Sequence, residues 1–140
     1  MKISEEDKEL LLKDLCARLP YMVNVKTTGD NESYILLSIN SNKNIALIGL
    51  DFDDVYATSK IKIDDVKPYL RPISSMTKEE EKEYNELYYD APQFKDGWRD
   101  AKYLEGLHID YLNKNMFDYR GLIEKGLAIV APEGIYKVGD

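Results

Sequence analysis

Residues 33–50 of the chain read SYILLSINSNKNIALIGL, and this stretch decides the fold class. Two apolar runs, Ser33–Ile39 and Ile45–Leu50, are rich in β-branched residues and flank the polar run Asn40–Asn44. Runs of this length and composition are typical of β-strands. Because parallel strands need a crossover of about a dozen residues or more, so short a connection predicts an antiparallel pair.

The neighbouring stretches extend this sheet. Tyr21–Thr28 alternates apolar and polar residues and ends at the turn-forming run 29–32. A fourth strand is predicted at Tyr56–Ile63, where Ile61 and Ile63 alternate with lysines. The four runs together predict an antiparallel four-stranded meander, of which a small barrel is the strongly bent form.

A helix is predicted before the sheet, over residues 4–18. Ser4 supplies an N-cap, and Leu11, Leu15 and Leu19 recur at helical spacing, with Cys16 on the same apolar side. Pro20 ends the helix because it disfavours helical geometry at the residue before it. After the fourth strand, 64–72 contains two prolines and is expected to leave the sheet, extended or as a short turn.

The second half of the chain changes to helical periodicity. Thr77 and Glu80 form a capping box that opens a helix to about Tyr89. Further helices are predicted at Trp98–Asn113 and at Asp118–Gly126. Runs 127–130 and 135–138, joined through Pro132 and Gly134, predict a small C-terminal β-hairpin. The chain is therefore expected to form one compact α+β domain, 1–140, with a helix and antiparallel sheet in 1–72 and a helical part with the hairpin in 73–140.

Composition and charge exclude several classes of protein. No apolar run approaches the roughly 18–20 residues that span a bilayer, and the acidic N-terminus lacks a signal peptide, so a cytoplasmic protein without membrane association is expected. A formal net charge of −7 makes nucleic acid an unfavourable partner. With one cysteine and one histidine, the chain cannot form an internal disulfide or a site built from several of these ligands, and no cofactor or metal is expected.

The strongest catalytic pattern is Leu50-Asp51-Phe52-Asp53-Asp54-Val55, which follows an apolar strand. It resembles the first motif of haloacid-dehalogenase-type phosphotransferases, in which two aspartates act with Mg²⁺. That chemistry needs a parallel sheet and a distant second aspartate pair, whereas this sheet begins with hairpins and the pair at 64–65 lies too close in sequence. We interpret Asp51, Asp53 and Asp54 as an acidic turn and a candidate binding surface, and keep a hydrolase or metal enzyme as a third reading.

The lone histidine and cysteine do not define a catalytic site either. No nucleophile is specified near His108, and a single histidine on a helix flank is typical of a boundary residue. Cys16 on an apolar helix face is typical of a core residue. We therefore expect no catalytic residues and no enzymatic activity.

The helix that begins after Thr77 carries the main candidate binding surface. Four carboxylates at helical spacing form an acidic stripe: Glu79, Glu83, Glu86 and Asp90. Like charges at this spacing destabilise a helix by a few tenths of a kcal/mol, so the stripe does not serve helix stability. It is either a solvated face or a contact with a basic protein partner.

The chain contains 11 tyrosines, a residue that offers rigid contact area with a polar tip. Tyr89, beside an aspartate, is expected to be exposed. Four others are expected to line the core: Tyr84, Tyr88, Tyr103 and Tyr111.

The alternative function is a nucleic-acid-binding regulator. The helix from Asp118 followed by a hairpin is similar in pattern to a winged helix, with Arg120, Lys125 and Lys137 as contacts. Asp118 and Glu124 on the same helix, together with the global charge, oppose this alternative.

Three stretches carry a resemblance that covers most of the chain: 15–21 (LCARLPY), 65–77 (DVKPYLRPISSMT) and 113–128 (NKNMFDYRGLIEKGLA). They resemble a group of small proteins of unknown function from Bacteroides-type gut bacteria and their phages and mobile elements. The chain departs from that group at Met22, where a glycine is expected, and at Met116, where a histidine is usual. The resemblance implies a phage or mobile-element setting and brings no activity. The leading hypothesis is a non-enzymatic binding or accessory protein that acts through an acidic, tyrosine-rich surface on a protein partner.

Overall fold

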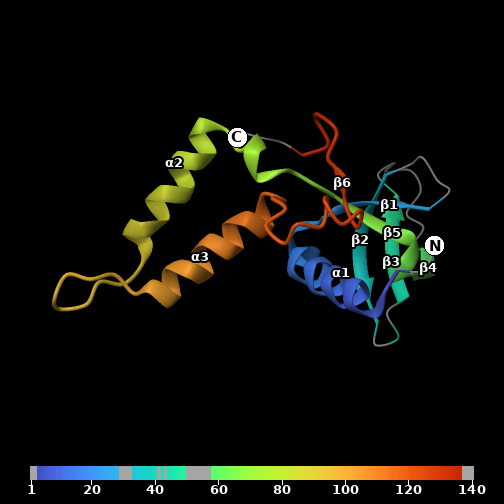
Figure 1. Ribbon diagram of the computed structural model, residues 1–140, viewed down its shortest axis with the longest axis horizontal. Helices are drawn as coiled ribbons and strands as arrows, with labels where there is room; N and C mark the ends of the chain where they lie inside the picture. The colour runs from blue at the N-terminus through green and yellow to red at the C-terminus, as the bar shows by residue number, and fades with distance from the viewer. Residues whose placement is uncertain (1–2, 29–32, 41, 43, 50–57, 137–140) are drawn as a thin grey trace.

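The computed structural model describes residues 3–28, 33–40, 42, 44–49 and 58–136 and has an α+β fold (Figure 1). Its six-stranded sheet has the strand order β4-β3-β2-β1-β5-β6. The strands are β1 Asn24–Thr27, β2 Ser33–Ile39, β3 Asn44–Gly49, β4 Thr58–Lys62, β5 Val66–Leu70 and β6 Ile129–Val130.

The antiparallel order predicted for the first four strands is confirmed, but the sheet as a whole is mixed. β1, β2, β3 and β4 pair antiparallel in sequence order, with a register shift between Leu36 and Ser38 in β2. β6 runs parallel to β5 at the other edge. In the described part of the chain the sheet is open, because no pairing joins β4 to β6.

β5 corrects the expectation that residues 64–72 leave the sheet. It pairs antiparallel with β1, with Pro68 opposite Val25. The Thr28 amide donates to the Asp65 carbonyl at 2.9 Å, so the even-numbered residues of β1 occupy the hydrogen-bonded positions of this ladder. Pro68 therefore faces a non-hydrogen-bonded position, where its missing N–H removes no bond to β1.

Tyr136 bridges β1 and β5 where their direct pairing ends. Its hydroxyl accepts a hydrogen bond from the Asn24 amide at 3.0 Å and donates to the Tyr69 carbonyl at 2.8 Å. Asn24 and Tyr69 would form the next hydrogen-bonded pair of the ladder, so the phenol takes the place of a direct backbone bond. Burial raises the pKa of this hydroxyl, which keeps the hydrogen-bonding proton in place.

The predicted first helix is confirmed as α1, Glu5–Arg18, with the Ser4 hydroxyl accepting from the Asp7 amide at 3.1 Å. Leu11 and Leu15 are buried and join one core cluster with residues of the sheet and the C-terminal segment. Cys16 is exposed, so its placement on the core side was wrong. A 3₁₀ turn, η1 Leu19–Tyr21, follows the helix.

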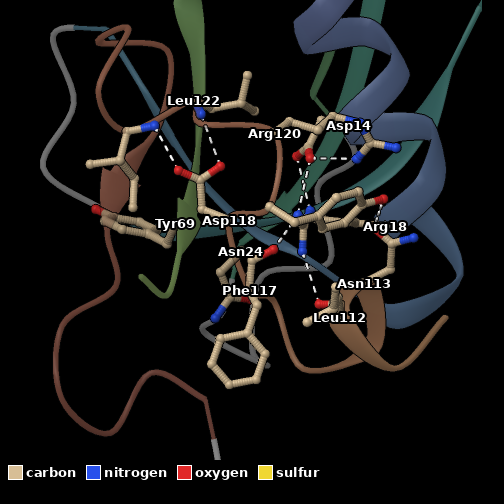
Figure 2. Close-up of polar contacts among 12 residues, drawn as sticks. Asp14, Arg18, Asn24, Tyr69, Leu112, Asn113, Phe117, Asp118, Arg120 and Leu122 are labelled. Atoms are coloured by element: carbon tan, nitrogen blue, oxygen red, sulfur yellow. Dashed lines mark hydrogen bonds and ion pairs between the residues drawn. The ribbon is translucent and has the colours of Figure 1, made fainter. Parts of the chain in front are cut away.

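A charged cluster is buried where α1 meets the residues after α3 (Figure 2). The Asp14 and Arg18 side chains form an ion pair at 2.9 Å with 0% exposure each. Arg120 adds a second ion pair to Asp14 at 2.8 Å. The Arg18 guanidinium also donates to the Phe117 carbonyl at 2.6 Å and lies over the Tyr119 ring. Each buried charge has partners, and several of these contacts join α1 to residues 112–120. The cluster therefore holds the helix against this segment.

Two helices form an arm that projects from one end of the sheet (Figure 1). α2 spans Lys78–Glu86, continues as the 3₁₀ turn η4, Leu87–Asp90, and is joined by residues 91–100 to α3, Ala101–Lys114. The capping box predicted for the first of these helices is present. The second helix begins at Ala101 instead of Trp98, because Asp100 caps the amides of Lys102 and Tyr103.

The third helix predicted for the second half is absent, because 118–126 form turns. Asp118 accepts hydrogen bonds from the Leu122 and Ile123 amides, both at 2.9 Å (Figure 2). Gly121 and Gly126 have φ of +75° and +74°, which is incompatible with a continuous right-handed helix. The predicted C-terminal hairpin falls only partly within the described residues: β6 pairs with β5, and residues 137 and 138 lie outside them.

Two methionines have left-handed backbone geometry. Met22, after η1, has φ +59°, and Met116, after α3, has φ +62°. Glycine adopts this conformation at little cost, whereas a side chain adds about 1–2 kcal/mol of strain. Met22 is exposed and Met116 is buried in the core cluster, so only the second offsets its strain by packing.

Candidate functional site

The acidic stripe lies on the outside of the arm, and all four of its carboxylates are exposed. Because α2 ends at Glu86 and gives way to a 3₁₀ turn, the stripe does not continue as one helical line to Asp90. Glu83, Glu86 and Asp90 instead line a shallow depression whose remaining wall is Leu87 and Tyr89. Glu79 lies at the start of α2 and is not part of this lining.

The three carboxylates of the depression differ in their partners. Glu83 accepts a hydrogen bond from the Tyr111 hydroxyl at 2.9 Å, which ties it to α3. Glu86 is 4.0 Å from Lys82, an exposed pair that contributes little to stability. The depression therefore combines concentrated negative charge with apolar and aromatic walls, a surface suited to the aliphatic stem and charged end of a lysine or arginine.

The tyrosines of the arm fall into two groups. Tyr84 stacks on His108 with ring centroids 4.1 Å apart and meets Tyr111 edge to face, so these rings form the contact between the two helices. Tyr89 is 69% exposed, as predicted. Tyr88 and Tyr103 were wrongly assigned to the core: both are exposed, Tyr88 on η4 and Tyr103 in the first turn of α3.

The arm is anchored to the sheet by Arg71 and Glu80. The guanidinium and the carboxylate are joined by two hydrogen bonds of 2.7 and 2.8 Å, and both residues are buried. The hydrogen bonds from Arg71 hold the pKa of Glu80 below its ordinary value, against the opposing effect of burial. Arg71 also lies 4.2 Å from the Phe117 ring centroid and donates to the Asn115 carbonyl. The direction of α2 is thus fixed by a charged contact.

Sequence reasoning missed two residues at the far end of the arm, in the loop that joins η4 to α3. Trp98 is 72% exposed and Phe94 is 54% exposed. The adjacent Asp96 and Gly97 are a turn signal, and two aromatic residues beside such a turn could have indicated an exposed pair. The arm therefore ends in an apolar tip next to the acidic depression.

The nucleic-acid alternative relied on Arg120, Lys125 and Lys137. The recognition helix that this alternative requires is absent from 118–126. Arg120 is half-buried and paired with Asp14, and its guanidinium lies 4.5 Å from the Tyr119 ring centroid. Lys125 is exposed, and Lys137 lies outside the described residues.

The remaining candidates are placed as follows. Asp51, Asp53 and Asp54 lie outside the described residues. Within the described residues, no group of three or more histidine, cysteine, aspartate or glutamate side chains is arranged to hold a metal ion. The same part of the chain contains no helix of sufficient length and apolarity to cross a bilayer.

Comparison of the chain with protein-family models, with curated proteins and with solved structures found no match.

Proposed function

We propose that this protein is a non-enzymatic binding or accessory protein that acts on a protein partner through the acidic, tyrosine-rich face of its arm. The face consists of Glu83, Glu86, Leu87, Tyr89 and Asp90. The observation that carries the proposal is the gathering of three exposed carboxylates around an exposed tyrosine on an element that projects from the core.

Two physical arguments support a binding role over a structural one. Glu83 and Glu86 are like charges three residues apart on α2, a spacing that opposes helix stability. Most of the contacts that fix the arm use other side chains, namely Arg71, Glu80, Tyr84 and Tyr111, and Glu83 joins them through the Tyr111 hydroxyl. A surface with rigid aromatic contact area and one sign of charge fits recognition of a basic protein surface.

The setting is part of the same proposal. The resemblance of 15–21, 65–77 and 113–128 to proteins of Bacteroides-type bacteria and their phages supports an origin in a phage or mobile element. Small proteins of this kind often work by binding a host or phage macromolecule.

The test is quantitative recovery of a partner from lysate of the native host. Glu83→Lys and Glu86→Lys are compared with Glu124→Lys, which makes the same charge change at an exposed position away from the arm. Tyr111→Phe accompanies Glu83→Lys, because it removes the hydrogen bond to Glu83 without changing charge. Glu83→Lys and Glu86→Lys are each expected to lower retention of the partner at least about tenfold, which corresponds to about 1.4 kcal/mol of binding free energy.

The same recovery is also measured at two salt concentrations. Raising the ionic strength from about 0.1 M to about 1 M shortens the Debye length from about 10 Å to about 3 Å and weakens contacts between exposed charges. Retention of the wild-type partner should fall over this range. Equal losses for Glu86→Lys and Glu124→Lys, or recovery of nucleic acid in place of protein, would contradict the proposal.

A further inference from the structure

The tip of the arm exposes aromatic side chains that the core does not use. The chain has one tryptophan and three phenylalanines, and Trp98 and Phe94 stand in water at the loop between η4 and α3. Aromatic residues of this size normally contribute to the core or to an interface. Exposed Tyr89 lies on the preceding turn, η4. We call Tyr89, Phe94 and Trp98 the aromatic tip.

The loop that carries the aromatic tip is a tight hairpin. The Phe94 amide donates to the Trp98 carbonyl at 2.7 Å, and the Gly97 amide donates to the Phe94 carbonyl at 2.9 Å. Gly97 has φ +93°, the left-handed geometry that closes a three-residue hairpin loop with a bulge. Asp96 accepts from the Trp98 amide at 3.1 Å. Three hydrogen bonds thus fix the five consecutive residues 94–98.

The hairpin register places the two largest side chains together. Gln93 pairs antiparallel with Arg99, so Phe94 and Trp98 stand opposite each other as the next pair. Opposed residues of an antiparallel pair carry their side chains on the same side. Phe94 and Trp98 therefore present a joint apolar surface to solvent.

Arg99 locks the hairpin to η4. Its guanidinium donates to the Ala91 carbonyl at 2.9 Å and to the Tyr89 carbonyl at 3.3 Å, and it lies within 6 Å of the ring centroids of Tyr88 and Tyr89. The aromatic tip and the acidic depression are consequently parts of one ordered unit. Side chains held in place before binding lose little conformational entropy when a partner covers them.

We infer that the aromatic tip is the anchor of the partner interface and inserts into an apolar cleft of a protein whose rim carries lysine and arginine side chains. This inference rests on the proposed function and adds the shape and chemistry of the partner. Interface anchors are enriched in tryptophan and tyrosine and lie in desolvated pockets, with charged groups at the edge. Beside Tyr89 the edge is negative, through Glu86 and Asp90, and at that point it requires a positive rim on the other side.

The same charges disfavour two other occupants. A second copy of the chain would bring its own carboxylates against this edge, and like charges across an interface repel. An anionic bilayer surface would repel them for the same reason. Both occupants can be tested with the purified chain, because Trp98 is its sole tryptophan and its emission reports burial of the tip.

The first experiment records Trp98 emission against protein concentration and against vesicles of phosphatidylcholine with and without phosphatidylglycerol. An emission maximum that stays where water-exposed indole emits supports the inference. A blue shift that grows with protein concentration would assign the tip to self-association, and a blue shift with either vesicle would assign it to a membrane; either result overturns the inference.

The second experiment maps the contact in cells of the native host. Phe94 is replaced by the photo-crosslinking residue p-benzoylphenylalanine, which keeps an aromatic side chain at the tip. The matched control carries the same residue at Val130, which is 52% exposed on β6, at the opposite end of the molecule from the loop 91–100 (Figure 1). Crosslinks at position 94, absent at 130, to a protein segment containing apolar residues beside lysine or arginine support the inference. Equal yields at both positions, or crosslinks to segments without basic residues, overturn it.

Affinity for that partner separates the two proposals. Trp98→Ala is expected to weaken binding about thirtyfold at any salt concentration, because apolar anchors are not screened, whereas Val130→Ala has no effect. Glu86→Lys should act mainly at low salt. If Glu86→Lys weakens binding and Trp98→Ala does not, the proposed function stands and the anchor is refuted. If Trp98→Ala alone weakens binding, the acidic face is refuted. Phe94→Ala serves as a second test of the aromatic tip. Each variant is compared only if its thermal midpoint equals that of the wild type, so that misfolding of one variant is not mistaken for lost binding.

Discussion

Replacing Asp14 by asparagine removes one negative charge from the buried cluster that also contains Arg18 and Arg120. The carboxylate accepts hydrogen bonds from two Arg18 nitrogens at 2.9 and 3.0 Å and from Arg120 at 2.8 Å. The asparagine side chain has nearly the same shape, but one of its two terminal atoms is a donor that faces a guanidinium donor. The change therefore alters charge and hydrogen bonding and leaves packing almost unchanged.

The expected loss of stability follows from the burial of this cluster. Removing one partner of a buried ion pair costs about 3–5 kcal/mol, because the other charge stays buried without compensation. The Arg18 side chain is completely buried and, beside the one neutral acceptor of the asparagine, keeps only backbone carbonyls and the Tyr119 ring as partners. Arg120 is partly accessible and can be hydrated. We expect Asp14→Asn to lower the free energy of unfolding by about 4 kcal/mol, a large part of the roughly 5–15 kcal/mol that stabilises an ordinary domain.

Urea denaturation measures this loss directly, with the m-value checked for constancy. The thermal midpoint should fall by about 15 °C, at roughly 4 °C per kcal/mol for a chain of this size. Asp110→Asn, the same change at an exposed position on α3, should stay within about 0.5 kcal/mol of wild type. The pair Asp14→Leu with Arg18→Met should be more stable than Asp14→Asn, because it leaves no fully buried charge. A loss below about 1 kcal/mol for Asp14→Asn would refute the reasoning.

Three further predictions concern single positions and use urea denaturation. The pKa of Glu80 is lowered by its hydrogen bonds from Arg71, so the pair stabilises the fold above the unfolded carboxyl pKa and this contribution is lost as the pH falls through the folded value. Glu80→Gln should remove that part of the acid dependence; an unchanged pH profile would contradict it. Tyr136→Phe should cost about 1–3 kcal/mol because it leaves a buried strand amide without a partner, and a cost near zero would argue against the bridge. Met22→Gly should stabilise the fold by about 1 kcal/mol by relieving left-handed strain at an exposed site, whereas Met116→Gly should destabilise it because the buried side chain is lost; equal effects of the two changes would exclude this explanation.

The sheet shows how local rules succeed and where they stop. Apolar periodicity and short polar turns predicted β1 to β4 because those signals are local. β5 was missed because a proline within a run argues against a strand, and only the register against β1 shows that Pro68 faces a non-hydrogen-bonded position. Such a register is a long-range property that sequence spacing does not contain.

The same limit explains the errors in the helical half. Residues 118–126 have helical spacing of apolar residues, but Asp118 satisfies the amides of Leu122 and Ile123 in a turn, and two glycines adopt positive φ. Asp14 and Arg18, four residues apart, have the spacing of an exposed helix pair, and only packing against the chain after α3 buries them.

The candidate site was predicted in part. The exposed position of Tyr89 followed from its polar neighbours, and the acidic stripe followed from spacing alone. The convergence of Glu83, Glu86 and Asp90 into one depression depends on the 3₁₀ turn after α2, which the sequence pattern did not reveal. The exposure of Phe94 and Trp98 depends on the hairpin between the helices. Asp96 and Gly97 are a turn signal there, but no exposed aromatic pair was predicted from it.

Hydrogen–deuterium exchange of the full chain, free and bound to its partner, tests the central claim that the arm is the binding surface. Exchange should slow in residues 83–100, which comprise the end of α2, η4 and the hairpin, because a bound partner covers these amides and suppresses local opening. The β1, β2 and β5 strands should exchange at the same rate in both states. Protection confined to the sheet or to residues 118–136, with no change in 83–100, would contradict the account.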